Sequence, residues 1–157
     1  MKDPTDTTPA SRDRPESFPE VVASKFSFLL DRGFRYSVES DESVLYESPD
    51  GIFVRVFRDP RDRYVGFRAG LASRPRDALT VPEFARLTGA TTKGDYPETT
   101  SELHVDADRL ARLLEDYGER VLAGDETILD EAMVLRSEYT KSFTRSESPN
   151  EQRDKDT

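Results

Sequence analysis

Residues 34–71, FRYSVESDESVLYESPDGIFVRVFRDPRDRYVGFRAGL, decide the fold of this chain. Apolar and polar side chains alternate in four runs within this stretch, a pattern that is typical of β-strands with one buried face. Polar segments that favour turns separate the runs, at Ser40–Glu42, Pro49–Gly51 and Asp59–Asp62. Because such short connections join neighbouring antiparallel strands, the stretch predicts a four-stranded meander.

The lengths of the turns predict how the strands pair. The first turn places Tyr36 opposite Tyr46, and the three-residue loop at 49–51 places Tyr46 opposite Val54. A four-residue loop at 59–62 then places Arg58 opposite Arg63. One apolar face runs across all four strands in this register. A slip of one residue would turn a strand over, so the agreement supports the meander.

Helical patterns flank the predicted sheet on both sides. A capping box at Ser17 and Glu20 begins a helix that Gly33 ends. Three more helices are expected after the sheet, over 80–89, from about Asp106 to 123, and from 125 to 143. The predicted fold is therefore α+β, with a four-stranded antiparallel meander, an N-terminal helix and three C-terminal helices.

The ends of the chain differ in composition from the middle. Residues 1–16 and 146–157 are rich in charged residues and proline and carry almost no large apolar side chain. Such segments bury too little surface to offset the entropy cost of ordering. We expect two disordered tails, at 1–16 and 146–157, around a single domain at 17–145.

Composition narrows the classes of function. The chain of 157 residues has a formal net charge of −9 and no cysteine, so disulfides and thiolate sites are excluded. An acidic protein needs a concentrated basic patch to bind nucleic acid, which argues against such a partner. No run of about 18 apolar residues is present, so we expect no membrane association and a cytoplasmic location.

Motifs for catalysis or cofactor binding are absent from the sequence. His104 is the only histidine, and the sequence has no Gly-x-Ser-x-Gly elbow motif, so a hydrolase with a serine nucleophile is not expected. The segment Gly89–Gly94 resembles a phosphate loop, but its lysine precedes the second glycine and it follows a helix rather than a strand. We therefore expect no cofactor and no metal, and a non-enzymatic role rather than an enzyme.

The second face of the predicted sheet is the best functional candidate. Aromatic and arginine side chains alternate on it, and these residue types are enriched at protein interfaces. A helix, a second copy of the chain, another protein or single-stranded RNA are the alternatives for what covers it, and the acidic charge argues against RNA. The candidate binding residues are Arg35, Phe53, Arg55, Phe57, Tyr64 and Arg68.

The long segment 90–103 suggests a different kind of site. Loops of this length in a compact domain are often functional or disordered. A small-ligand pocket or an enzyme active site beside this loop would use His104, Asp106 and the Lys93–Asp95 region. This interpretation is the alternative to a protein-interaction module.

Three short motifs resemble those of a known group of proteins. They are the tract Phe28 to Phe34, the segment from Tyr46 through Val54 to Arg61, and Tyr117-Gly118 followed by 122–125. Together they resemble a group of small uncharacterised prokaryotic α+β proteins, some of them immunity-like or antitoxin-like. The resemblance spans roughly residues 18–140 and implies a protein-interaction role, for example as an immunity-like or adaptor module, without assigning a role to any residue.

Overall fold

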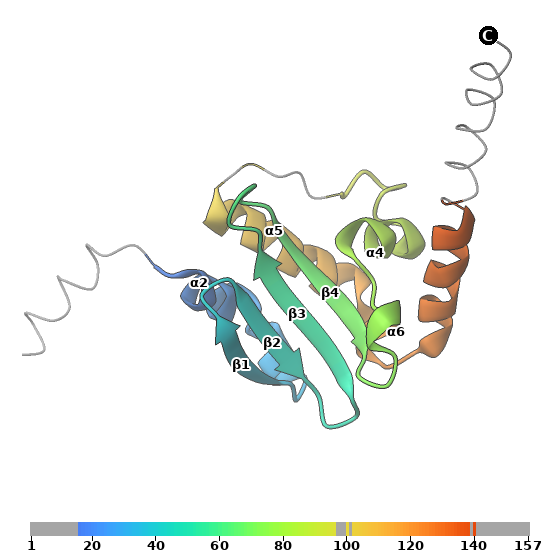
Figure 1. The fold of residues 1–157 in the computed structure, drawn as a ribbon, viewed down its shortest axis with the longest axis horizontal. Helices are drawn as coiled ribbons and strands as arrows, with labels where there is room; N and C mark the ends of the chain where they lie inside the picture. The colour runs from blue at the N-terminus through green and yellow to red at the C-terminus, as the bar shows by residue number, and fades with distance from the viewer. Residues whose placement is uncertain (1–15, 97–99, 101, 139, 141–157) are drawn as a thin grey trace, which may run out of the picture.

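The computed structural model describes residues 16–96, 100, 102–138 and 140. A four-stranded antiparallel sheet in the order β1-β2-β3-β4 forms its centre, as the sequence predicts. In Figure 1, α2 and α5 lie behind the sheet, and α4 and the last helix lie to the right of β4. The elements are, in order, α2 (Phe18–Lys25), α3 (Phe28–Asp31), β1 (Arg35–Ser40), β2 (Ser43–Glu47), β3 (Ile52–Arg58), β4 (Val65–Leu71), η1 (Pro75–Asp77), α4 (Val81–Thr88), α5 (Leu103–Tyr117), α6 (Glu119–Leu122) and a last helix over 126–138.

The N-terminal helix begins where the sequence predicts, but it is interrupted. Ser17 and Glu20 form the expected capping box, and α2 follows directly. The helix ends after Lys25, and a separate turn of helix, α3, begins at Phe28. Phe26, at the interruption, and Leu29, in α3, are both fully buried. Gly33 then adopts a left-handed backbone conformation, with φ at 92°, which glycine tolerates without strain.

The first two hairpins have the predicted register. Tyr36 lies opposite Tyr46, and Tyr46 lies opposite Val54. A bulge at the end of β1 leaves Glu39 as an extra residue, because the pairing moves from Val38 directly to Ser40.

The predicted register between β3 and β4 is wrong by two residues. Arg58 lies opposite Val65 rather than Arg63, so the connection covers 59–64. Asp59 explains the longer turn, since its Oδ1 accepts hydrogen bonds from the backbone N–H groups of Arg61 and Asp62. Arg63 then takes a positive φ of 57°. A shift of two residues preserves the face on which each side chain lies, so the predicted apolar face survives the error.

The core lies between the sheet and the helices. Val44, Tyr46, Val54, Val56 and Phe67 from the sheet are buried there. They belong to one cluster with side chains from the helices, among them Val22, Phe26, Phe84, Leu110 and Leu114. Tyr36 and Val38 share this face of the sheet, yet they are 42% and 50% exposed, because β1 is the edge strand.

The C-terminal helices differ from prediction in their bounds. Thr80 and Glu83 form the expected capping box of α4. Helix α5 begins at Leu103, three residues before the predicted start, with the Glu102 side chain accepting a hydrogen bond from the Val105 N–H. It stops at Tyr117. Gly118 follows, and only glycine fits there, because an added Cβ would sit 2.3 Å from the backbone carbonyl oxygen of Leu114.

Some predictions concern residues that the structure does not describe. The proposed tails at 1–15 and 146–157 lie outside the described residues, as does the C-terminal part of the last predicted helix, 141–143. Glu16, at the end of the first proposed tail, is described and is exposed.

Candidate interaction face

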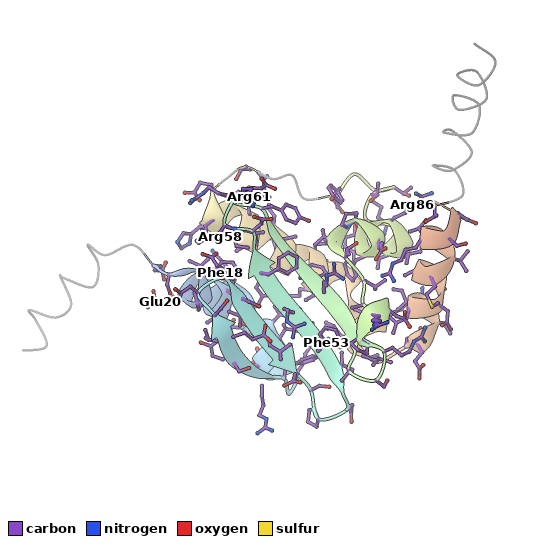
Figure 2. The ribbon with its side chains drawn as sticks, viewed as in Figure 1. Phe18, Glu20, Phe53, Arg58, Arg61 and Arg86 are labelled. Atoms are coloured by element: carbon purple, nitrogen blue, oxygen red, sulfur yellow. The ribbon has the colours of Figure 1, made fainter. Side chains whose placement is uncertain are left out.

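The sheet face turned away from the core carries the six predicted binding residues, and we call it the outer face. Pairing across the strands brings alternate residues to it: Arg35 lies opposite Glu47, Glu47 opposite Phe53, and Arg55 opposite Arg68. Figure 2 shows Phe53 on the side of the sheet toward the viewer, away from α2 and α5. No α-helix of the described ranges covers this face (Figure 1), which argues against the helix-covered alternative.

An aromatic pair occupies one end of the outer face. The rings of Phe57 and Tyr64 are 6.5 Å apart between centroids. The predicted register would place Phe57 opposite Tyr64, but Phe57 lies opposite Gly66. Gly66 leaves room for both rings, because a Cβ there would lie 2.9 Å from the Tyr64 ring and 3.1 Å from the Phe57 ring. Burial raises the pKa of Tyr64, and the nearby Tyr96 phenol adds to the effect.

Arg55 is held in place at the centre of the face. Its Nε and Nη2 donate to the two carboxylate oxygens of Glu39 at 2.8 and 2.9 Å. Its guanidinium also lies 5.8 Å from the centroid of the Phe53 ring, within reach of a cation–π interaction. The hydrogen bonds from Arg55 lower the pKa of Glu39 and outweigh the effect of burial. The bidentate pair therefore fixes the guanidinium before any partner arrives.

Phe53 is far less accessible than its neighbours on the outer face. Only 7% of its surface is exposed. Residues 75–79 fold back beside β4 at this end, and Ala78 lies over Gly70, the residue opposite Phe53. Phe53 therefore supports the fold and offers little surface to a partner. Phe57, Tyr64 and Arg55 are half-buried, while Arg35 and Arg68 are exposed.

The charge of the outer face differs from that of the whole chain. Three arginines project from it together with two glutamates, in a chain with a net charge of −9. One of the glutamates, Glu39, is already paired with Arg55. The face therefore leaves Arg35 and Arg68 exposed on a sheet that also carries two half-buried aromatic rings.

The residues of the alternative site near 90–103 do not converge. A groove of about 450 Å³ is lined by Gly94–Tyr96 and by one side of α5, but neither His104 nor Asp106 lines it. His104 Nε2 lies 3.1 Å from a carboxylate oxygen of Glu16. Asp106 is buried, and its Oδ1 accepts hydrogen bonds from the N–H and the hydroxyl of Thr100.

Most polar groups around this groove have partners within the chain. The Tyr117 hydroxyl donates to Asp95, and the Lys93 ammonium lies 5.6 Å from the centroid of the Tyr117 ring. Arg112 Nε is 2.9 Å from Asp108. In the part of the chain that the structure describes, no cluster of three or more His, Asp or Glu side chains is placed to hold a metal ion.

Sequence reasoning missed the exposed apolar strip along β1. Leu30, Tyr36 and Val38 are 42–50% exposed, although the alternating pattern assigned Tyr36 and Val38 to the buried face. The predicted meander places this strand at an edge of the sheet, but the alternating pattern alone does not show how much of its apolar face the helices leave exposed.

Comparisons with known proteins add no functional information. No protein-family model matches the chain, and no curated protein or solved structure matches it. No helix within the described residues has the length and apolar character needed to cross a membrane.

Proposed function

We propose that this protein is a non-enzymatic protein-interaction module, of the immunity-like or adaptor kind, which binds another protein through the outer face of its sheet. The observation that carries the proposal is the combination of exposed Arg35 and Arg68 with the half-buried Phe57–Tyr64 pair on a face without a covering α-helix. Arginine and aromatic residues dominate the energetics of protein interfaces. The proposal keeps the cytoplasmic location expected from the sequence.

The exposed arginines define the chemistry of the partner. A guanidinium forms paired hydrogen bonds with a carboxylate, so the complementary surface presents Asp or Glu around an apolar centre. Arg55 is already occupied by Glu39, which leaves Arg35 and Arg68 for the partner. Phosphates of a nucleic acid would meet the same guanidinium groups, but the net charge of −9 opposes a polyanion.

A small-ligand site in the groove beside α5 is the second candidate. Its volume of about 450 Å³ lies within the usual range of ligand pockets. The internal pairing of Asp95 with Tyr117 and of Arg112 with Asp108 leaves fewer polar groups for a ligand. The groove therefore ranks below the outer face.

An affinity capture from the source lysate, followed by calorimetry with the purified partner, tests the proposal. Arg68→Glu should weaken binding at least about tenfold, or about 1.4 kcal/mol, because it reverses an exposed charge on the outer face, opposite Arg55. Arg112→Glu is the matched control, since Arg112 is exposed on α5, on the other side of the sheet. Equal binding by both variants, or loss of binding only with Arg112→Glu, would refute the proposed face.

A further inference from the structure

The outer edge of β1 is open. Among residues 16–96, 100, 102–138 and 140, no strand pairs with it, and all six of its residues are exposed. Exposed strand edges promote pairing with another chain, and monomeric proteins usually protect them with proline, lysine or a covering segment. β1 contains neither proline nor lysine, and its bulge comes only at Glu39.

The backbone of β1 is oriented to accept another strand. The Ser48 N–H donates to Ile52, and the Arg58 N–H donates to Glu42, so the even-numbered residues of β2 direct their backbone groups to β3. The odd-numbered residues of β2 therefore face β1. Given the register of Ser37 with Leu45, Ser37 bonds to β2, whereas Tyr36 and Val38 point their N–H and C=O groups outward.

The sequence of β1 is complementary to itself when two copies run antiparallel. Centred on Ser37, the stretch Arg35-Tyr36-Ser37-Val38-Glu39 places Tyr36 opposite Val38 of a second copy. It also places Arg35 opposite Glu39, the bulge residue whose carboxylate holds Arg55 of its own chain. Opposite charges and apolar side chains thus meet in the positions where cross-strand pairs stabilise a sheet. The register also joins the outward-facing groups of Tyr36 to those of Val38.

We propose that two copies of this chain pair through β1 around a two-fold axis at Ser37, joining their sheets into one continuous sheet. Such an axis is perpendicular to the sheet, so the helices of both copies lie on the same side. The apolar side chains of Tyr36 and Val38, which are left exposed on that side, would then meet those of the second copy. The alternative occupant of this edge is a strand from a different protein, in which case the chain alone would be a monomer.

This dimer does not depend on the proposed function. It uses the edge of β1, the helix side of Tyr36 and Val38, and Arg35, which the proposed function also uses. Phe57, Tyr64 and Arg68 on the outer face stay uncovered. The two outer faces would lie side by side, which makes the module bivalent. Arg68→Glu should weaken partner binding and leave the dimer intact, whereas Val38→Pro should abolish the dimer and leave Phe57, Tyr64 and Arg68 unchanged, so the two proposals can fail separately.

Sedimentation velocity of the full chain over a concentration series tests the dimer. The wild type should show twice the mass of one chain, with a shift toward one chain on dilution. Arg35→Glu places two glutamates opposite each other at both ends of the pairing, and Glu39→Arg places two arginines there, so each variant alone should lose the dimer mass. In an equimolar mixture, the glutamate introduced into one chain lies opposite the arginine introduced into the other, so the mixture should restore the dimer.

The mixing experiment separates pairing from misfolding. Glu39→Arg also removes the partner of Arg55 within its own chain, but an unfolded variant would not recover a dimer when mixed. Val38→Pro supplies a second test, because it removes an outward N–H that takes no part in the β1–β2 ladder, and proline is tolerated on edge strands. Val38→Pro should be a folded monomer by circular dichroism and sedimentation. A wild type with the mass of one chain at every concentration, or a dimer that survives Val38→Pro, would overturn the proposal.

Discussion

The two edge strands of the sheet, β4 and β1, differ in whether another segment of the chain covers their outer edge. At β4, Ala69 and Leu79 exchange two backbone hydrogen bonds, of 2.8 and 3.1 Å. Phe84 of α4 packs edge-on against Phe67, with 5.4 Å between the ring centroids. At β1, no described residue continues the sheet, and Tyr36 and Val38 remain exposed. The same alternating sequence pattern therefore gives a closed edge where the chain folds back and an open edge where it does not. The contacts at the closed edge stabilise the fold, and the open edge leaves surface available for association.

The largest expected loss of stability comes from removing a buried side chain beside β4. Phe84→Ala should lower the free energy of unfolding by about 3–5 kcal/mol, because it removes a fully buried ring and leaves a cavity beside Phe67. Urea denaturation followed by circular dichroism measures the change. Val38→Ala at the open edge is the control and should change stability by no more than about 0.5 kcal/mol in dilute protein. Similar losses in both variants would mean that the two edges are equally buried.

An intermediate effect is expected from adding volume at the closed edge. In Gly70→Val the new Cβ would meet the Ala78 Cα at 3.0 Å, and a backbone atom has little room to move. We expect a loss of about 1–3 kcal/mol, the usual cost of overpacking. Ser37→Val on β1, on the same sheet face, should cost nothing comparable in thermal denaturation of dilute protein, because Ser37 is exposed. A neutral Gly70→Val would show that 75–79 does not hold Ala78 against β4.

The smallest expected effect is a change in stability at acidic pH. Burial alone would raise the pKa of Glu83, but hydrogen bonds from Arg136 and from Thr80 outweigh it and leave the pKa lowered. A lowered pKa in the folded state means that the charged form contributes stability above the ordinary value of 4.5, and that this contribution is lost as the pH falls through the folded value.

Glu83→Gln tests this pH dependence at the closed edge, where Arg136 joins the last helix to α4. The variant should be less stable than the wild type at neutral pH, and the difference should shrink as the pH falls below 4.5. Thermal denaturation over a pH series measures it. A difference that stays constant with pH would show that Glu83 does not act through its charge.

Local patterns were sufficient to predict most of the sheet. The turn signal at Pro49–Gly51 and the alternation in β2 and β3 predict a register that the structure confirms, because a hairpin loop and its strands are contiguous in sequence. The β3–β4 register was wrong because Asp59 accepts two backbone hydrogen bonds and Arg63 adopts a positive φ, which lengthens the turn. Neither choice is visible in the residue types alone.

The candidate site was predicted in part. The assignment of Arg55, Phe57 and Arg68 to one face follows from the two-residue period of a strand, and it survived the error in register. The near-complete burial of Phe53 did not follow from the sequence. Gly70 lies opposite Phe53 and Ala78 lies over Gly70, and these two residues come from a different strand and a later loop.

The sequence by itself determined the order of elements, the two-faced character of each strand and the capping boxes of α2 and α4, since these depend on residues within a few positions of one another. Only the tertiary structure decided which face the helices cover, that 75–79 closes the edge of β4, and that β1 stays open. These outcomes depend on contacts between segments far apart in the chain, and a strand's own residues carry no record of which neighbours will pack against them.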